Sequence, residues 1–503
     1  MGKKFSLSFF FLFIILSIAR GGTINCKGPV INTFSDSVSV NESELPVLTL
    51  YTNHQSIKKS KSIPALLQVS SKTIPYGNVD SNLNPLQLNV AVHIRGSSSS
   101  RFPKKSFSLK LLSTDGKNDT VVSLLGLPSG SEWVLNAPYD DRSLMRNALA
   151  YNLAANMGLL SIKTVFIELI LNGNYVGVYV LEQKIKCDSN SVNIPKLTLT
   201  DTIGNELTGG YILKIDRPSY GYQLWQLKTV LRVMAKKTAA IFKKNHQAGN
   251  HLKNRKNPYY QKYYLISSYP PIGASWQRTE FRYYSPSVSE ISPQQIQYIK
   301  TYINQAEASL QSPNFSDPDS GYRKYFDIES FINYFIITEL TKNADGYRLS
   351  TYFYKNRDSN GGKLSMGPVW DFNESMGNAN ICDAQNTNGW AYNFNNYCSS
   401  QPWLVPFWWQ RLMQDSLFVK QLNCRWHFLR QNVLKTSTVL NNIDSMAALL
   451  SQPQKRNFNR WHILNKQTHY SPFIPYSYTN EINNLKYWLT QRLNWLDKNM
   501  PGN

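Results

Sequence analysis

The sequence predicts an α+β fold that is sheet-rich in its N-terminal part and helix-rich in its C-terminal part. Up to residue 216, most regular segments alternate apolar and polar residues, which is the strand period. After residue 293, apolar residues recur every three or four positions, which is the helical period. Hydrophobic residues make up 42% of the 503 positions, enough to bury a sizeable core.

The N-terminal part is expected to hold several clear strands and one helix. The strands are expected at 88–94, 105–111, 165–171, 177–182 and 209–216, with a strand or two more within 23–60. Asn172-Gly173 lies between two of these strands and is a dipeptide that favours a tight hairpin turn. The helix is expected at 140–157, where one face is apolar and Gly158 can end it.

The C-terminal part is expected to be mainly helical, with one hairpin. The aromatic and β-branched run 350–355 predicts a strand, and Asn360-Gly361-Gly362 predicts the turn that reverses the chain toward 366–370. Helices are expected at 293–310, 328–340, 408–430, 443–450 and 480–496. The hairpin therefore interrupts the helical part after its second helix.

The first residues indicate a secretory route. Two lysines precede the apolar run 5–18, which is too short to span a bilayer but fits the core of a signal peptide. We expect a signal peptide at 1–21, an N-terminal extension at 22–64 and one large domain at 65–498; a signal anchor is the alternative at the start. No later run reaches 18 apolar residues. A chain without a transmembrane segment is therefore expected to be secreted, in the secretory lumen, or on a cell or spore surface.

Sequons and cysteines fit this route. Four Asn-X-Ser/Thr sequons suggest a glycoprotein, and they begin at Asn41, Asn118, Asn314 and Asn373. Five cysteines are few for a disulfide scaffold. Cys382 and Cys398 bracket an Asn-rich loop and are expected to form a disulfide.

Basic residues are concentrated in one segment. The formal net charge is +22, and no acidic residue occurs between Asp216 and Glu280. We interpret 217–275 as a basic insertion, with an amphipathic helical pattern at 227–244. Two interpretations stay open, a surface for an anionic partner and a solvated insertion without a ligand. Secretion makes nucleic acid the least expected partner.

Two carboxylates 26 residues apart are the main candidates for chemistry. Asp345 lies in Lys342-Asn-Ala-Asp345-Gly, and Asp371 lies in Pro368-Val-Trp-Asp371-Phe-Asn373 at the end of the predicted hairpin. Phosphoryl transfer needs one acid near the acceptor hydroxyl and another on a metal ion, both on a rigid support. Two alternatives stay open: surface acids on an ordinary hairpin, and the acid and base of a carbohydrate-active enzyme that stacks sugars on some of the 12 Trp residues.

A Gly/Ser loop between two predicted strands is the second candidate feature. Arg95-Gly-Ser-Ser-Ser-Ser100 follows the strand 88–94, and Lys105 begins the next strand. Backbone N–H groups of such a loop, together with an ammonium group, can hold phosphates. Many hairpins carry similar loops, so the motif alone does not decide the chemistry.

Six stretches follow one another along the chain in a characteristic order. They are Ile94-Arg-Gly-Ser-Ser-Ser-Ser-Arg-Phe-Pro-Lys-Lys-Ser-Phe107, Trp133-Val-Leu-Asn-Ala-Pro-Tyr-Asp140, Leu144-Met-Arg-Asn-Ala-Leu149, Leu171-Asn-Gly-Asn-Tyr-Val-Gly-Val-Tyr179, Gly209-Gly-Tyr-Ile-Leu213, and Asn343-Ala-Asp345 with Trp370-Asp-Phe372. In this order they resemble the CotH family of spore-coat atypical kinases, and the resemblance spans roughly residues 65–498. Ordered agreement of several motifs is more specific than any one of them.

The resemblance implies a two-lobed, atypical protein-kinase-like fold that transfers the γ-phosphate of ATP to Ser or Thr of secreted, coat or surface proteins. It implies Mg²⁺, or Mn²⁺ in its place, as the metal. By position, Asp345 would be the catalytic base and Asp371 a metal ligand. The implied nucleotide-binding residues are Arg95, Ser98, Lys105 or its neighbour Lys104, and Glu182. Glu182 would orient the lysine.

Two positions depart from the family pattern, and we expect them to weaken the binding of a divalent cation. Asn373 stands where the family has a second acid, and Ser350 stands where kinases place a metal-ligating Asn. Both supply an oxygen atom to a metal but no negative charge. The alternative function is therefore a catalytically weak or inactive coat or surface protein that acts as an adhesin or scaffold. Because Asn373 lies in the predicted site, its sequon is expected to be unused.

Overall fold

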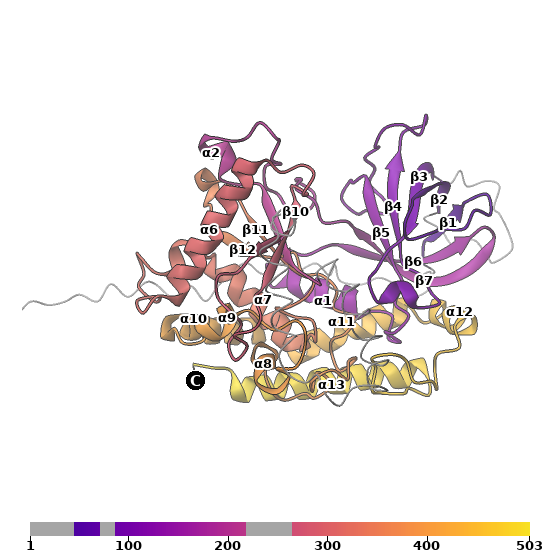
Figure 1. The fold of residues 1–503 in the computed structure, drawn as a ribbon. Helices are drawn as coiled ribbons and strands as arrows, with labels where there is room; N and C mark the ends of the chain where they lie inside the picture. Colours follow the sequence, from indigo (N-terminus) through magenta and orange to yellow (C-terminus); the bar gives the residue numbers. More distant parts are fainter. Residues whose placement is uncertain (1–44, 71–85, 218–263, 503) are drawn as a thin grey trace, which may run out of the picture.

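A computed structural model describes residues 45–70, 86–217 and 264–502 of the chain (Figure 1). The signal peptide expected at 1–21, the helical pattern at 227–244 and most of the basic insertion lie outside these ranges. The described part is α+β, with a seven-stranded closed barrel at one end and a helical body that carries a second, five-stranded sheet. The expected fold class, sheet-rich first and helix-rich later, is confirmed.

Seven strands of the N-terminal part form the closed barrel. They are β1 (Val47–Tyr51), β2 (Ile63–Ser70), β3 (Leu86–Ile94), β4 (Phe107–Leu112), β5 (Glu132–Asn136), β6 (Thr164–Leu171) and β7 (Asn174–Gln183). The strand order is β1-β2-β3-β4-β5-β7-β6, and a parallel pairing of β1 with β6 closes the ring. Alternate residues point inward, so apolar side chains such as Leu109, Leu111 and Trp133 fill the interior.

The first strand of the barrel lies in the segment predicted to be an N-terminal extension. The boundary predicted at residue 64 falls inside β2, which pairs with β1 along its length. Leu48 and Leu50 of β1 are fully buried in the barrel core. Residues from Val47 onward therefore belong to the barrel.

A second sheet joins strands from both parts of the chain. Its order is β12-β11-β8-β10-β9, with β8 (Tyr211–Ile215), β9 (Tyr264–Ile266), β10 (Glu280–Ser285), β11 (Thr351–Lys355) and β12 (Leu364–Met366). The predicted hairpin is β11 and β12, and β11 also pairs antiparallel with β8. Asp345 precedes β11 and Asp371 follows β12. Because β11 pairs with β8 of the N-terminal part, both acids are held close to that part of the chain.

Most of the helices lie below the second sheet and the barrel in Figure 1. The longer ones are α1 (Arg146–Asn156), α6 (Pro293–Gln311), α7 (Ile328–Thr341), α10 (Ser416–Arg430), α11 (Thr436–Leu449), α12 (Pro453–Arg460) and α13 (Tyr478–Asn499). Short helices are α2 (Gly204–Leu207), α8 (Phe394–Tyr397) and α9 (Phe407–Leu412). α7 is buried along almost its whole length and contacts α1, α10 and α13. It is therefore a core helix, and the loop that follows it has a rigid base.

The first predicted helix is shorter than expected. It was expected at 140–157 but begins only at Arg146. The Asp141 carboxylate accepts hydrogen bonds from the backbone N–H groups of Ser143 and Arg146, and these bonds turn the chain before the helix starts. An aspartate that bonds nearby backbone competes with helix formation, which apolar periodicity does not register.

The helix predicted at 408–430 is in fact two helices, α9 and α10. Asp415 lies at the break, and its carboxylate accepts a hydrogen bond from the backbone N–H of Leu417 at 2.9 Å. Asp415 is thus the N-cap of the second helix. The apolar spacing continues across this break, so the periodicity of the sequence predicted one continuous helix.

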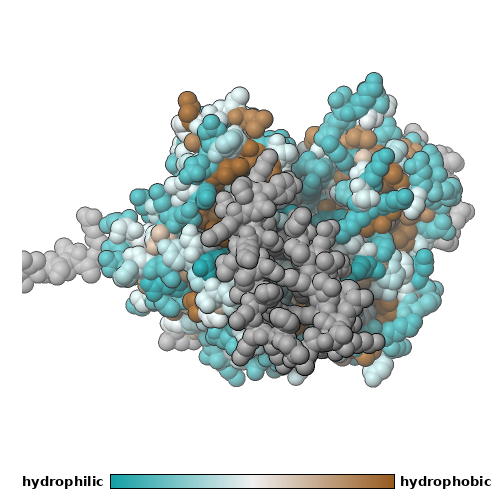
Figure 2. Space-filling model, in the orientation of Figure 1, coloured by the Kyte–Doolittle hydropathy of each residue, from teal (hydrophilic) through white to brown (hydrophobic). Residues whose placement is uncertain are grey.

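Cys382 and Cys398 form the expected disulfide, with their Cα atoms 5.8 Å apart. No helix within the described ranges is both long and apolar enough to cross a bilayer. The face seen in Figure 2 is mainly hydrophilic, with apolar groups near α2, where Leu199 and Ile203 are exposed.

Candidate active site

A cavity of about 510 Å³ lies where the barrel, the second sheet and α1 meet. The predicted site residues in its wall are Arg95, Ser98, Asp345, Ser350, Asp371 and Asn373. Folding therefore brings the two candidate acids and the Gly/Ser loop to one shared space, although they lie far apart in the sequence.

Asp345 lies in the loop that follows α7. The helix ends at Lys342, whose left-handed backbone, with a φ of 43°, turns the chain out of the helix. The Lys342 ammonium donates to three backbone carbonyls within 383–388, and the backbone N–H of Asp345 donates to Asn343 Oδ1 at 3.2 Å. These bonds give the Asp345 carboxylate a defined place in the cavity wall.

Two arginines accompany the Asp345 carboxylate. Arg348 Nη2 lies 3.1 Å from Asp345 Oδ1, and Arg217 Nη2 lies 3.8 Å from Asp345 Oδ2. Arg348 is buried and also donates to the Ala344 carbonyl, while Arg217 stacks on the Trp403 ring at 5.4 Å from its centroid. A carboxylate oriented in this way can accept a hydrogen bond from a hydroxyl group brought into the cavity.

Asp371 lies directly after the hairpin in an unusual backbone conformation. Its φ is 66°, a left-handed value that is uncommon outside glycine and that occurs often at functional sites. Helix α1 supports this conformation, because the Tyr151 hydroxyl accepts from Asp371 N at 2.9 Å and Asn147 Oδ1 accepts from Phe372 N at 2.7 Å. Ser350 Oγ donates to Asp371 Oδ2 at 3.1 Å. The two predicted metal ligands Ser350 and Asp371 are therefore adjacent.

The carboxylates in the cavity wall disfavour one another's ionisation. Burial raises the pKa of the Asp371 carboxyl, and the negative charge of Asp345 adds to this rise. Burial also holds the pKa of Glu374 well above its ordinary value, and Asp345 and Asp371 add to the effect. Because like charges in a buried site are costly, this part of the cavity favours a bound cation or proton.

Arg95 and Ser98 lie on the loop between β3 and β4, as predicted. Gly96 has a φ of 102°, and a Cβ at this position would lie 2.2 Å from Ser99 Oγ, so the turn requires glycine. The Arg95 guanidinium lies 5.2 Å from the centroid of the Trp370 ring. The loop thus places one cation next to the loop that carries Asp371.

Neither of the two lysines predicted to hold phosphates lies in the cavity wall. The buried Lys104 ammonium donates to the Val178 carbonyl and to Asn457 Oδ1, and burial lowers its pKa well below its ordinary value. Lys105 Nζ donates to the Ser100 carbonyl at 3.0 Å and so braces the Gly/Ser loop. Neither lysine therefore contributes to the cavity wall. Of the described residues, the cations in the wall are Lys59, Arg95, Lys214, Arg217 and Arg282.

Glu182 lies on β7 and is fully buried. Burial raises the pKa of its carboxyl to about 8, and Arg95 is the cation whose charge opposes this rise. The residue predicted to orient a lysine therefore interacts electrostatically with Arg95 instead.

The sequence reasoning missed four acids in the cavity wall, Asp140, Asp141, Asp216 and Glu374. Burial disfavours the Asp216 carboxylate, but Lys214, at 2.6 Å, outweighs burial and holds the pKa of this acid below its ordinary value. Glu374 directly follows Asn373, one position beyond the place where the second acid is sought. The run Asp-Phe-Asn-Glu was therefore the available signal for Glu374.

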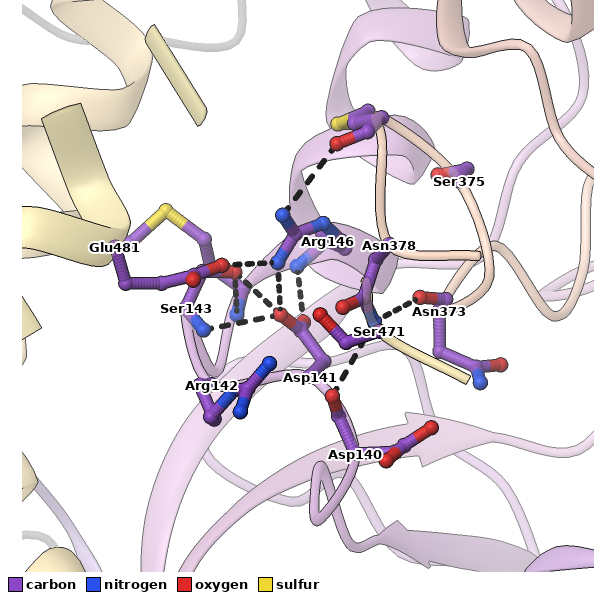
Figure 3. Close-up of polar contacts among 12 residues, drawn as sticks. Asp140, Asp141, Arg142, Ser143, Arg146, Asn373, Ser375, Asn378, Ser471 and Glu481 are labelled. Atoms are coloured by element: carbon purple, nitrogen blue, oxygen red, sulfur yellow. Dashed lines mark hydrogen bonds and ion pairs between the residues drawn. The ribbon is translucent and has the colours of Figure 1, made fainter. Parts of the chain in front are cut away.

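A buried ion-pair network beside the cavity joins α1 to α13 (Figure 3). Arg146 Nη1 lies 2.6 Å from Asp141 Oδ1 and 2.7 Å from Glu481 Oε1 on α13. Asp141 and Asp140 both belong to the cavity wall, and the Asp140 carbonyl accepts a hydrogen bond from Asn378 at 3.3 Å. The C-terminal helix is thereby linked to the wall of the candidate site.

Within the described ranges, no group of three or more His, Cys, Asp or Glu side chains is arranged as a metal site. Mg²⁺ at nucleotide sites usually takes one or two carboxylates, and phosphate oxygens and water complete its six ligands. Asp371, with the Ser350 hydroxyl beside it, fits this smaller set of protein donors.

Comparison with known proteins identifies the family. Residues 92–496 match the family described as CotH kinase protein, so the chain belongs to that family. This confirms the resemblance seen in the six ordered stretches. A region of 146 residues is 27% identical to the inner spore coat protein H of Bacillus subtilis (strain 168) and covers 28% of this chain. The aligned region spans 34% of that relative.

Proposed function

We propose that the protein is a secreted, kinase-like enzyme that transfers the γ-phosphate of ATP to Ser or Thr hydroxyls of secreted, coat or surface proteins. The observation that carries the proposal is one cavity of about 510 Å³ shared by Asp345, Asp371 and the Gly/Ser loop. Membership of the CotH kinase protein family and similarity to a spore coat protein support it. The barrel and the helical body would be the two lobes of an atypical kinase-like fold.

The acids divide the chemistry between them in this proposal. Asp345 orients the acceptor hydroxyl and takes its proton, since its own carboxylate is positioned by Arg348. Asp371 would hold Mg²⁺ or Mn²⁺, with Ser350 and Asn373 as neutral oxygen donors. The metal would neutralise the phosphate charge and thereby favour transfer.

The phosphates would be held by Arg95 and Ser98. A guanidinium can bind phosphate through two parallel hydrogen bonds, and Trp370 keeps this one at the cavity wall. Glu182 would act on Arg95 rather than on a lysine, through the electrostatic interaction between their side chains.

Label transfer from γ-labelled ATP tests the proposal directly. The full chain is incubated with MgCl₂ or MnCl₂ and a panel of secreted coat proteins. Asp345→Asn should reduce transfer by at least about 100-fold, the usual size of a general-base contribution, and should leave the thermal shift caused by ATP and metal intact. Asp371→Ala should remove both signals.

Asp444→Asn is the matched control, because Asp444 is exposed and pairs with Lys486 at 2.8 Å outside the cavity wall. It should leave both signals unchanged. Label transfer that persists in both Asp345→Asn and Asp371→Ala would refute the assigned roles.

A non-catalytic coat or surface scaffold is the second candidate function. It is favoured by Asn373 and Ser350, which bring no charge to the proposed metal site. The scaffold would bind ATP and metal, or neither, without transferring label. If it acts as an adhesin through the basic insertion, deletion of residues 227–262 should abolish its binding to an anionic partner and leave the nucleotide-dependent thermal shift unchanged.

A further inference from the structure

Glu374 has a fixed backbone position between the two proposed catalytic loops. Its carbonyl accepts a hydrogen bond from Ala344 N at 3.1 Å, immediately before Asp345. Two residues later, Met376 N donates to the Thr341 carbonyl at 2.7 Å. The segment that follows Asp371 is therefore tied to the loop after α7 at two points.

The Glu374 side chain is buried and faces the cavity. It is 7% exposed and belongs to the cavity wall. Its Oε2 has no hydrogen-bond partner among the residues that the structure describes. A buried carboxylate oxygen without a donor is costly, so this atom calls for a cation or a proton.

Neighbouring charges increase that demand. Asp140, Asp345 and Asp371 line the same cavity wall as Glu374 and repel a negative charge on it, whereas Arg217, in the same wall, attracts it. Arg217 is already 3.8 Å from Asp345 and stacks on Trp403. One shared arginine therefore attracts the Glu374 carboxylate while three carboxylates repel it, so a further positive charge would be favourable here.

We propose that Glu374 is a ligand of the divalent cation in this cavity and supplies the negative charge that Asn373 lacks. The inference rests on the proposed function for the presence of a metal–nucleotide complex. In a regular strand, positions 371 and 374 would point to opposite faces. The left-handed backbone at Asp371 breaks that alternation, and both side chains belong to the wall of one cavity.

The donor chemistry fits a metal that also binds a nucleotide. Asp371 and Glu374 supply two carboxylates, which is the number that Mg²⁺ or Mn²⁺ commonly takes from protein when phosphates complete the coordination. Asn373 remains nearby as a neutral oxygen donor, and its carbonyl is held by Asn378 at 2.9 Å (Figure 3). The acid of the metal motif has thus moved by one position rather than disappeared.

Direct Mn²⁺ binding tests this inference without relying on catalysis. Mn²⁺ is titrated into the full chain, with and without a non-hydrolysable ATP analogue, and free Mn²⁺ is measured by electron paramagnetic resonance. Glu374→Gln should weaken Mn²⁺ binding about tenfold or more, because one negative ligand is lost. Adding Asn373→Asp to Glu374→Gln should recover most of the affinity. Glu206→Gln, on an exposed position of α2, is the matched control and should change nothing.

Equal Mn²⁺ affinity in the wild-type and Glu374→Gln proteins, both folded by circular dichroism, would overturn the inference. So would a wild-type chain that binds no Mn²⁺ under either condition. If Glu374→Gln does not fold, Glu374→Asp decides: this variant keeps the charge but retracts the carboxylate, so several-fold weaker binding supports the inference and unchanged binding overturns it.

The failure of this inference differs from the failure of the proposed function. If the chain transfers label but Glu374→Gln leaves its Mn²⁺ affinity unchanged, the kinase-like function is retained and Glu374 is not a metal ligand. Loss of Mn²⁺ binding in Glu374→Gln, in a chain that never transfers label, would retain the metal site and refute the kinase-like function.

Discussion

Replacing Arg146 with methionine tests how strongly the buried ion-pair network stabilises the helical body. The side chains of Arg146, Asp141 and Glu481 are at most 2% exposed, and both carboxylates lie within 2.7 Å of Arg146 Nη1. Methionine fills much of the same space but brings no charge and no donor. The Arg146→Met variant therefore leaves two buried carboxylates without their cation.

The expected loss of stability follows from that geometry. Breaking a buried ion pair by removing one partner costs about 3–5 kcal/mol. The unfolding entropy is about 2.1 cal/mol/K per residue, so about 400 described residues give roughly 0.8 kcal/mol/K. If unfolding is one cooperative transition, the thermal midpoint should fall by about 4–6 °C.

Thermal unfolding followed by circular dichroism provides the assay, with Lys486→Met as the matched control. Lys486 pairs with Asp444 at 2.8 Å, but the Asp444 side chain is 54% exposed, so this loss should be about 0–1 kcal/mol. Adding Glu481→Gln to Arg146→Met should recover part of the stability, because one stranded charge disappears. An Arg146→Met midpoint no lower than that of Lys486→Met would refute the reasoning.

Three further predictions follow from single contacts. Lys104→Met removes the ammonium donor from two buried acceptors, the Val178 carbonyl and Asn457 Oδ1, although Asn457 Oδ1 still accepts from Val178 N. It should destabilise the fold by about 1–3 kcal/mol. The Lys104→Met variant should keep its affinity for ATP, whereas Arg95→Met should weaken ATP affinity about tenfold. Calorimetric titration with ATP measures both affinities. A larger loss in Lys104→Met than in Arg95→Met would favour the lysine prediction instead. Tyr151→Phe removes the acceptor for Asp371 N at a cost of about 1 kcal/mol, and should weaken metal-dependent ATP binding several-fold in the same titration. Burial raises the pKa of Glu307 from its ordinary 4.5 to about 7. The folded state therefore binds this proton more tightly than the unfolded state does. The resulting stabilisation is fully present below pH 4.5 and is lost as the pH rises to about 7. Urea unfolding measures the free energy of unfolding at pH 5 and at pH 8. The decrease from pH 5 to pH 8 should be smaller in Glu307→Gln than in the wild type by roughly 1–3 kcal/mol. Equal decreases in the two proteins would contradict the assignment.

Elements whose determinants are local could be predicted closely. The hairpin of β6 and β7 was expected from alternation and from Asn172-Gly173 at its turn. Helix α6 begins at the predicted residue, where Ser292 and Gln295 form a capping box. By contrast, β5 and β10 were not predicted, since each is short and becomes a strand by pairing with neighbours distant in sequence.

The part of the candidate site that lies close together in the sequence could be predicted. Asp345 and Asp371 bracket one hairpin, so strand signals and two acids were enough to pair them. Which basic side chains reach the cavity was not decided locally. The Lys104 ammonium donates to the Val178 carbonyl of β7 and to Asn457 of α12, and only the assembled fold shows that Arg95 lies in the cavity wall while Lys104 does not.

By itself, the sequence determined the fold class, the hairpin, the disulfide and the family. These depend on periodicity, on turn residues and on ordered motifs, which can be recognised from residues close together in the sequence. Only the tertiary structure decided which charged side chains face the cavity. Side chains of neighbouring residues on a strand or loop can point in opposite directions, and the packing of distant elements selects between them. For this reason Lys104 is buried behind the site, while Glu374, which no motif singled out, lies in its wall.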